Sequence, residues 1–296
     1  MALIRALGTG VSGLKNFQTD LDVVGNNLAN VSTTGYKQER ITFQDAMNQT
    51  LRAAQPSINA TQVGLGSKVG AIDADQTSGT LTSTGQPLDL AIKGAGFFVL
   101  DTSEQHATQE STLFTRDGHF HLDGDGYLVT DAGLRVQGRK RDPTTGAILP
   151  PDTEKHMVYT EAIQIPKAAD SQGASSKPNL DVSSVSVSGD GMIHYKLSGS
   201  SAAYEVGPVA IDQIYNPEGL ERLGNNVLRD NDASGKEHYD DNTDKKIVSG
   251  TLEASNVDMT EQMTTLIEAQ RAYQANAETI TTADQILDDL VKLKRS

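Results

Sequence analysis

Apolar residues near the N-terminus recur every seven positions, which is the spacing of one face of a long helix. A companion apolar set falls three or four positions away from the first, so that the two sets form a continuous stripe. The leading set is Leu7, Leu14, Leu21 and Leu28, and the companion set is Ile4, Val11, Phe17, Val24 and Val31. The pattern predicts a helix over about residues 2–29, roughly 42 Å long at about 1.5 Å per residue.

The C-terminal end repeats the same spacing. Its leading set is Met259, Leu266, Tyr273, Ile280 and Leu287, and its companion set is Met263, Ala269, Ala277, Ala283, Leu290 and Val291. Asp258 followed by Glu261 resembles a capping box with aspartate in the place of serine or threonine. We therefore predict a second helix that begins after Asp258 and runs to about Lys294.

Glycines weaken the N-terminal helix. Gly8, Gly10, Gly13 and Gly25 lie within it, and each costs about 1 kcal/mol relative to alanine in a helix interior. Because such a helix is unstable alone, we expect the two ends to pair as one coiled coil that orders mainly upon assembly. An intramolecular helix pair with no role in assembly fits the same stripes. The predicted assembly interface consists of Leu7, Leu14, Leu21, Leu28, Met259, Leu266, Tyr273, Ile280 and Leu287.

Between the helical ends the pattern changes to the alternation that is typical of strands. Apolar residues alternate in 88–92 and cluster in 97–100. Asp-Gly pairs at 125–126 and 190–191 each separate two alternating runs, which is a strong hairpin signal. The middle of the chain is therefore predicted to be antiparallel β structure.

The predicted fold class is α+β, with paired terminal helices and an antiparallel β-rich middle. We divide the chain into a discontinuous helical core of residues 1–32 and 256–296, an extended connector over 33–77, and a β-rich outer domain over 78–250. Polar loops are expected at 101–112, 170–179 and 229–246.

Composition and charge narrow the classes of function. The 296 residues are 36% hydrophobic and 5% aromatic, with no tryptophan, which favours a chain that is partly elongated or that completes its core with partners. The formal net charge is −14, and most of it falls between the helical ends. Nucleic-acid binding and docking on anionic lipid both need clustered Lys and Arg, so we expect neither partner.

The chain contains no cysteine, which excludes disulfides, thiolate chemistry and cysteine-based zinc sites. No stretch reaches the roughly 18 apolar residues of a membrane span. The N-terminal apolar residues are spaced rather than continuous, unlike those of a secretory signal. We expect no membrane insertion, and a protein that is either cytoplasmic or exported by a route that reads no cleaved signal.

Two histidines suggest a fragment of a metal site. His119 and His121 are two positions apart, which places them on the same face of a strand. No third ligand follows at a useful spacing, so strand histidines without a metal are the simpler interpretation.

Residues 230–241 partly match a calcium loop, with oxygen ligands at positions one, three, five and twelve and Gly235 at the sharp turn. The ligands would be Asp230, Asp232, Ser234 and Asp241. The twelfth position is aspartate rather than glutamate and the eighth is Glu237 rather than an apolar residue, so a polar surface loop is the alternative.

Motifs of the common enzyme classes are absent from the sequence. It contains no nucleophile elbow, phosphate-binding loop, dinucleotide fingerprint or zinc-protease motif. We therefore expect no catalytic residues, no cofactor and no enzyme activity.

Four blocks of sequence, in order along the chain, resemble the bacterial flagellar rod and hook proteins. The first is NNLANVSTTGYK at 26–37, and the second is TGQPLDLAI at 84–92, continuing through GFF at 96–98. The third comprises FTRDG at 114–118 and GYLVT at 126–130. The last comprises SNVD at 255–258, EAQRAYQAN at 268–276 and TAD at 282–284.

The resemblance implies a self-assembling tube, in which the terminal helices line a central channel and the β domain packs outside. The partners it implies are many copies of the same chain, neighbouring axial proteins (rod, hook cap and hook–filament junction) and the flagellar type III export apparatus. It also implies an extracellular location in the hook or basal body, reached by export without a cleaved signal peptide.

Within this family the sequence resembles the small hook proteins of Gram-positive bacteria, through residues 63–67 and 285–295. The interpretation is a subunit of the flexible hook that transmits torque to the filament. The alternative is a subunit of the rigid distal rod, which the length of segment 48–63 favours. A secreted β-rich enzyme or adhesin is a distant alternative that leaves both apolar stripes unexplained.

Overall fold

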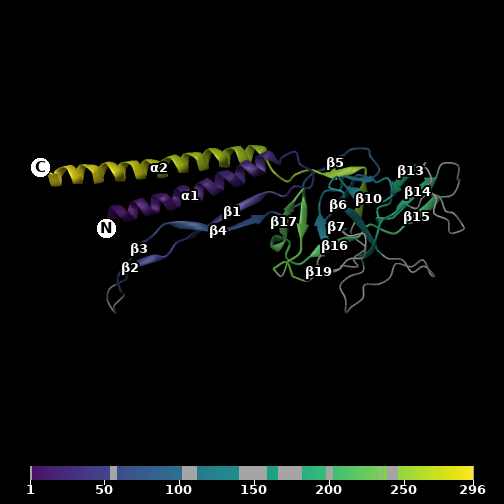
Figure 1. The fold of residues 1–296 in the computed structure, drawn as a ribbon, viewed down its shortest axis with the longest axis horizontal. Coiled ribbons are helices and arrows are strands. Elements are labelled where there is room, and N and C mark those ends of the chain that lie inside the picture. The colour runs from purple at the N-terminus through teal and green to yellow at the C-terminus, as the bar shows by residue number, and fades with distance from the viewer. Residues whose placement is uncertain are drawn as a thin grey trace. The chain divides into compact units, whose positions relative to one another are not determined.

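A computed structural model describes residues 2–53, 59–101, 112–139, 159–165, 182–197, 203–231, 233–235, 237–238 and 246–295. The chain forms two compact units (Figure 1). The terminal unit comprises residues 1–31, 37–75 and 257–296, and the β unit comprises residues 32–36 and 76–256. The α+β fold class is confirmed.

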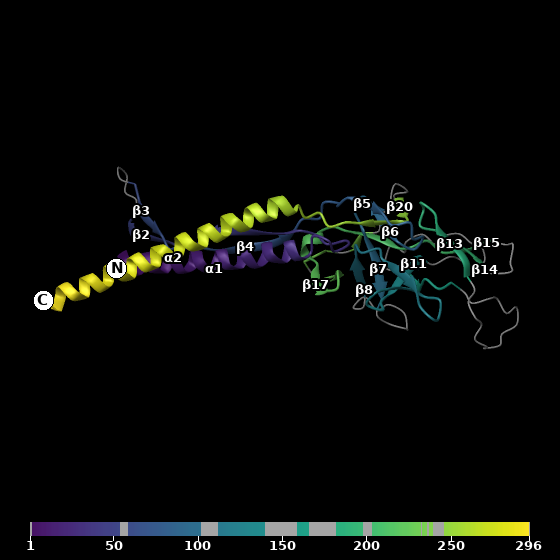
Figure 2. The ribbon, with the colours of Figure 1, turned by 90° about the horizontal axis from the view of Figure 1, so that it is seen from above.

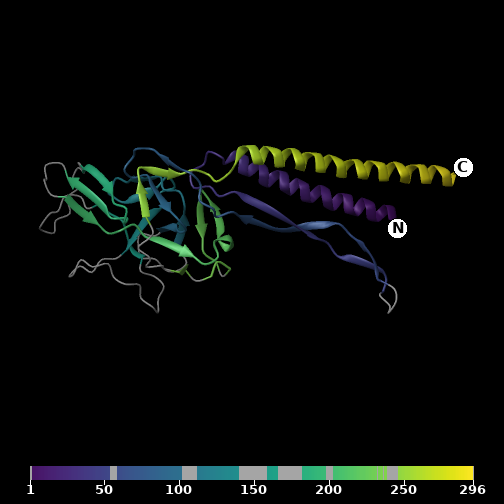
Figure 3. The same cartoon turned by 180° about the vertical axis from the view of Figure 1, so that it is seen from behind.

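The terminal unit is built on two antiparallel helices, α1 (Ala2–Ala29) and α2 (Met259–Arg295). Figures 1, 2 and 3 show them side by side, with α2 continuing past the N-terminal end of α1. The Asp258 side chain caps α2, because its Oδ1 accepts hydrogen bonds from the amides of Thr260 at 2.7 Å and Glu261 at 3.1 Å. The two helices lie against each other, so the predicted pairing of the two ends is confirmed. That they become ordered mainly upon assembly remains a prediction.

A twisted ribbon of four strands completes the terminal unit. Antiparallel pairing joins the first strand to the fourth and the second to the third. The strands are β1 (Glu39–Asp45), β2 (Asn48–Arg52), β3 (Thr61–Gly64) and β4 (Ser67–Ala74). The ribbon packs on α1, where the rings of Phe17 and Phe43 lie 5.9 Å apart and Asn16 Nδ2 donates to Ser67 Oγ at 2.7 Å. Most of the predicted connector is therefore paired strand, and the three-part division of the chain remains a prediction.

The β unit is antiparallel throughout its described strands. Its main sheet has the order β17-β18-β8-β7-β11-β10-β9, with β12, β16 and β19 attached, beside a three-stranded sheet β13-β14-β15 and the pairs β20-β6 and β21-β5. The strands are β5 (Leu81–Ser83), β6 (Leu90–Lys93), β7 (Phe97–Asp101), β8 (Thr112–Thr115), β9 (Phe120–Leu122), β10 (Leu128–Thr130), β11 (Arg135–Arg139), β12 (Tyr159–Ala162), β13 (Val182–Val187), β14 (Ile193–Leu197), β15 (Ala203–Val206), β16 (Ile211–Ile214), β17 (Glu221–Gly224), β18 (Val227–Arg229), β19 (Glu237–His238), β20 (Lys246–Ser249) and β21 (Thr251–Glu253), and a 3-10 turn η1 spans Pro217–Gly219.

Both predicted Asp-Gly hairpins are present. β9 pairs with β10 across Gly126, and β13 pairs with β14 across Gly191. Each glycine has a positive φ, 83° and 82°, which side chains other than glycine rarely adopt. The predicted loop at 170–179 and nearly all of that at 101–112 lie outside the described residues, and the third, 229–246, includes the short strand β19.

The core of the β unit contains the apolar side chains that the alternation predicted. Phe98 is fully buried and meets Phe120 edge-on, with ring centroids 5.1 Å apart. The buried cluster around them is Leu90, Ile92, Leu100, Leu113, Leu128, Val136, Ile163, Ile165, Ile193, Tyr195, Val209, Ile211, Val227 and Ile247.

Candidate assembly interface

Small and polar residues lie at several points of the contact between α1 and α2. A Cβ added at Gly10 would lie 3.0 Å from Ile280 Cγ1, and one added at Gly13 would lie 2.8 Å from Asn276 Oδ1. On α2, Ala269 and Ala283 are buried. The helices therefore approach closely where glycine and alanine allow it.

The nine predicted interface residues are only partly covered within the chain. Seven of them are half-buried, namely Leu7, Leu14, Leu21, Leu28, Leu266, Ile280 and Leu287. Met259 and Tyr273 are exposed, at 47% and 37%. The single chain thus leaves much of the leading stripes available to another molecule.

Three exposed side chains on α2 form a ridge: Met259, Met263 and Ile267, with exposed fractions of 47%, 48% and 50%. They are spaced by four residues, so they are neighbours on one helix surface. Further exposed apolar side chains on the two helices are Val11, Ile286, Leu290, Val291 and Leu293. Sequence reasoning missed Ile267 because it lies outside the seven-residue repeat, although its i, i+4 relation to Met263 is visible in the sequence.

Asn27 is a polar anchor that sequence reasoning also missed. It is 1% exposed, and its Nδ2 donates to Glu39 O at 2.8 Å and to Gln262 Oε1 at 3.1 Å. Its Oδ1 accepts from the Glu39 amide at 2.9 Å. The side chain therefore ties α1 to β1 and to α2, and its place in the NNLAN segment was the available signal.

The segment that follows α1 is fastened within the β unit. Thr34 Oγ1 donates to Asp117 Oδ1 at 2.9 Å, and Asn226 Nδ2 donates to Thr34 O at 2.8 Å. Gly35 has a φ of +66°, and a Cβ there would lie 2.7 Å from the Asp117 amide nitrogen. Two of the sequence blocks therefore meet here, at a contact that requires glycine. Burial raises the pKa of Asp117, although its hydrogen bonds from the His119 amide and Thr34 oppose the shift.

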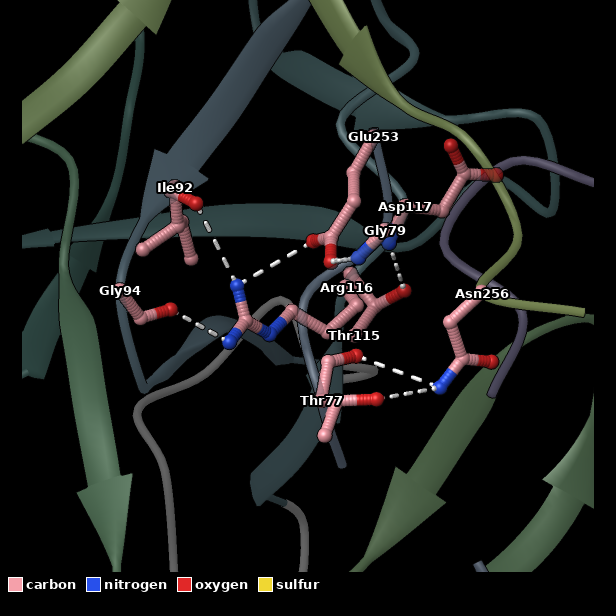
Figure 4. Close-up of polar contacts among 9 residues, drawn as sticks. All are labelled: Thr77, Gly79, Ile92, Gly94, Thr115, Arg116, Asp117, Glu253 and Asn256. Carbon is pink, nitrogen blue, oxygen red and sulfur yellow. Dashed lines mark hydrogen bonds and ion pairs between the residues drawn. The ribbon is translucent and has the colours of Figure 1, made fainter. Parts of the chain in front are cut away.

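A buried ion pair lies beside this contact (Figure 4). Arg116 Nη1 lies 3.2 Å from Glu253 Oε2, and the two side chains are 4% and 1% exposed. Arg116 Nη2 donates to Gly94 O at 2.6 Å, and the Gly79 amide donates to Glu253 Oε1 at 2.9 Å. Burial lowers the pKa of Arg116, and the negative charge of Glu253 opposes that shift.

The structure gives little support to the candidate metal site at His119 and His121. His119 and His121 are exposed, with Nδ1 atoms 3.1 Å and 3.6 Å from Asp131 Oδ1. Within the described residues, no group of three or more His, Cys, Asp or Glu side chains is arranged to hold a metal ion. The absence of a metal cofactor remains a prediction.

In the predicted calcium loop, Asp232 and Asp241 lie outside the described residues. The Ser234 hydroxyl hydrogen-bonds to Asp230 Oδ1, and Asn231 Oδ1 accepts from the amides of Ala233 and Ser234. These contacts are those of a polar turn.

Among the helices in the described part of the chain, none is long and apolar enough to span a membrane.

Three family descriptions match successive parts of the chain. Residues 7–37 match "Flagella basal body rod protein", residues 91–195 match "Flagellar hook protein FlgE/F/G D1 domain", and residues 248–293 match "Flagellar basal body rod FlgEFG protein C-terminal". The matches fall in the order of the sequence blocks that carried the resemblance.

Individual proteins similar to this chain are also flagellar rod and hook proteins. The flagellar basal-body rod protein FlgG of Bacillus subtilis (strain 168) is 37% identical over 303 residues, covering 99% of this chain and 100% of the relative. The protein of the same name from Borreliella burgdorferi is 33% identical over 99% of this chain and 100% of the relative. The flagellar hook protein FlgE of Treponema pallidum is 47% identical over 143 residues, covering 46% of this chain and 30% of that protein. The chain belongs to the flagellar basal-body rod and hook family, and is a structural subunit of the flagellar axis.

Proposed function

We propose that the chain is a subunit of the rigid distal rod of the flagellar basal body. The observation that carries the proposal is the length of the match to relatives named rod protein, which extends over 99% of this chain and 100% of the B. subtilis relative. Local resemblances at residues 63–67 and 285–295 favour the hook, whereas the full-length relatives favour the rod.

The hook is the second candidate. It is favoured by the higher identity, 47%, to the hook protein of Treponema pallidum. That similarity extends over 30% of the hook protein's own length. It therefore supports a common segment in the two proteins more strongly than a common function of the whole chains.

The subunit would act as a homopolymer held together by its terminal unit. The support is the set of apolar side chains on α1 and α2 that remain exposed or half-buried in the single chain. Burying such side chains stabilises association in proportion to the apolar area removed from water. The nine leading residues and the ridge of Met259, Met263 and Ile267 would pack against neighbouring copies.

Neighbouring axial proteins would join the two ends of the polymer, and these would include other rod proteins, the hook cap and the hook–filament junction. The subunit would leave the cytoplasm unfolded through the flagellar type III apparatus, without a cleaved signal peptide, and would reach an extracellular location in the flagellar basal body. It would have no catalytic activity and would bind no cofactor, nucleic acid or membrane.

Electron microscopy of basal bodies from a strain that lacks this gene tests the choice between rod and hook. If the chain is the distal rod, the rod should be short, because the missing segment lies below the hook. If the chain is the hook, a full-length rod should remain with no curved segment and no filament. Polymers of the purified chain add a second test, since a driveshaft should be straight and a universal joint should bend.

A further inference from the structure

Glu253 ends β21 at a point where three segments of the β unit come together (Figure 4). Its carbonyl oxygen accepts a hydrogen bond from the Gly35 amide at 2.8 Å, and its Oε1 accepts from the Gly79 amide at 2.9 Å. The chain passes between its two units next to residues 32–36, 76–80 and 253–256, which we call the crossing segments. Glu253 therefore belongs to one crossing segment and binds the other two.

The second and third crossing segments also bind each other. Asn256 Nδ2 donates to Thr77 Oγ1 at 3.1 Å and to Thr77 O at 3.3 Å, and the Ala254 amide donates to Thr80 O at 2.8 Å. A Cβ added at Gly79 would lie 1.9 Å from the carbonyl oxygen of Ala254. The backbones are thus too close for any side chain at this position.

Arg116 attaches this junction to the sheet. Besides its ion pair with Glu253, its guanidinium donates to Gly94 O at 2.6 Å and to Ile92 O at 3.5 Å. Ile92 lies in β6, whose residues Leu90 and Ile92 belong to the buried core. One cation therefore connects the core strand to the glutamate that holds the crossing segments.

Burying the Arg116–Glu253 ion pair costs desolvation free energy, so overall stability is a poor explanation for it. Both side chains are almost fully buried, and burial lowers the pKa of Arg116 despite the opposing charge of Glu253. Arg116 Nε is buried and has no hydrogen-bond partner among the described residues. Apolar side chains of similar volume often stabilise a core at least as well as such a pair. What apolar side chains do not provide is a set of directed bonds to three backbone groups, here the carbonyls of Ile92 and Gly94 and the amide of Gly79.

We propose that Arg116 and Glu253 form a clamp that fixes the three crossing segments against the core of the β unit, and that the clamp stiffens the subunit under load. Arg116 is a positioning residue in this arrangement, because it acts through Glu253. The role under load rests on the proposed function, whereas the clamping of the segments does not.

The decisive variant is Arg116→Met/Glu253→Gln. It removes both charges, keeps the length of the side chain at position 253, and leaves a side-chain oxygen for the Gly79 amide and the backbone carbonyl for the Gly35 amide. If the ion pair clamps the segments, hydrogen exchange at both amides should become about tenfold to a hundredfold faster, the effect of losing bonds to a charged group. The amides of Val99 and Phe114 in the sheet should keep their exchange rates.

Two outcomes would overturn the clamp. Unchanged exchange at Gly35 and Gly79 would show that the pair does not hold them. An equal increase in the exchange rates of the Val99 and Phe114 amides would show that the ion pair only contributes to the overall stability of the sheet. The matched control is Arg229→Met/Glu221→Gln, which removes an ion pair of 2.5 Å whose side chains are about half exposed, and it should change none of these rates.

A measurement on the unmodified chain covers the case in which the double variant does not fold. The Gly35 and Gly79 amides should then exchange as slowly as Val99 and Phe114, and fast local exchange at either glycine would refute the clamp. Polymers of the double variant should also bend more readily than those of the unmodified chain, and equal stiffness would refute the role under load. Failure of the unmodified chain to polymerise would instead count against the proposed function, and the exchange result would stand by itself.

Discussion

Gly13 of α1 faces Asn276 of α2 so closely that a Cβ at position 13 would lie 2.8 Å from the amide oxygen and 2.9 Å from the amide carbon. A glycine that weakens the isolated helix is thus what permits the two helices to meet. Gly8, one and a half turns earlier, has nothing within 4 Å of its added Cβ. The two glycines therefore have opposite consequences for substitution.

Replacing Gly13 with leucine should destabilise the terminal unit by about 1–3 kcal/mol, because the larger side chain forces the helices apart. Gly8→Ala should stabilise the same unit by about 0.5–1 kcal/mol, because it removes a helix-weakening glycine in open space. Thermal unfolding followed by the helical circular dichroism signal measures both. Equal effects of the two substitutions would contradict the close approach at Gly13.

A charge in the leading stripes should block polymerisation. Leu14→Asp or Ile280→Asp buries an unpaired carboxylate where helices pack, at a cost of about 2–5 kcal/mol, while the β unit stays folded. Sedimentation and electron microscopy report the polymer, and near-ultraviolet circular dichroism reports the β unit. Gln18→Asp and Glu278→Asp, at exposed positions, are the controls, and assembly of Leu14→Asp at their rate would disprove the interface assignment.

The ridge on α2 allows a cleaner separation of folding from assembly. Because Met263 and Ile267 are about half exposed, Met263→Lys and Ile267→Lys should change the stability of the monomer by less than about 0.5 kcal/mol. Both should nevertheless raise the protein concentration needed for polymerisation, measured by light scattering. Thr264→Lys carries the same charge on a different face of α2, and it should polymerise like the unmodified chain.

Asn27→Ala should destabilise the terminal unit by about 1–3 kcal/mol, because the backbone groups of Glu39 and the amide of Gln262 lose a buried partner. The neighbouring Asn26 is exposed and hydrogen-bonds to Glu39 Oε2 at a long 3.4 Å. Asn26→Ala should therefore have a small effect. Urea unfolding of the two variants provides the comparison, and a smaller loss for Asn27→Ala than for Asn26→Ala would refute the anchor.

Asp117 should make the stability of the β unit depend on pH. Burial raises its pKa in the folded chain, so the folded state binds the proton more readily than the unfolded state does. The corresponding stabilisation is complete below the ordinary pKa of 3.8 and is lost as the pH rises through the raised value. Asparagine has no such proton, yet it keeps an acceptor for Thr34. The stability of Asp117→Asn relative to the unmodified chain should therefore increase in urea unfolding as the pH rises above 3.8, and a constant difference would contradict the shift.

Local patterns predicted the elements whose partners are near in sequence. The seven-residue repeats gave both helices to within a residue or two, and the Asp-Gly pairs gave the β9–β10 and β13–β14 hairpins. These signals work because periodicity and turn chemistry are local properties. The ribbon of β1–β4 was missed, because none of its residues is fully buried and such strands show only weak alternation of apolar and polar residues.

Long-range contacts were beyond local reasoning. Arg116 and Glu253 are separated by 137 residues, and neither residue differs in sequence from a solvated surface charge. The need for glycine at positions 35 and 79 could not be predicted from the sequence either. At both positions the atoms that exclude a side chain belong to the backbone of residues distant in the sequence. The nine leading residues were chosen for their period, which identifies an apolar face but does not say which molecule covers it.

The antiparallel pairing of α1 with α2 has a consequence for the newly made chain. The 229 residues between Ala29 and Met259 must be synthesised before the partner of α1 begins to emerge, a delay of roughly 10–50 s at about 5–20 residues per second. With four glycines and its partner helix not yet made, α1 is expected to form no stable helix during that interval. We therefore expect the apolar stripe of residues 2–29 to remain uncovered during most of synthesis, until α2 has been made.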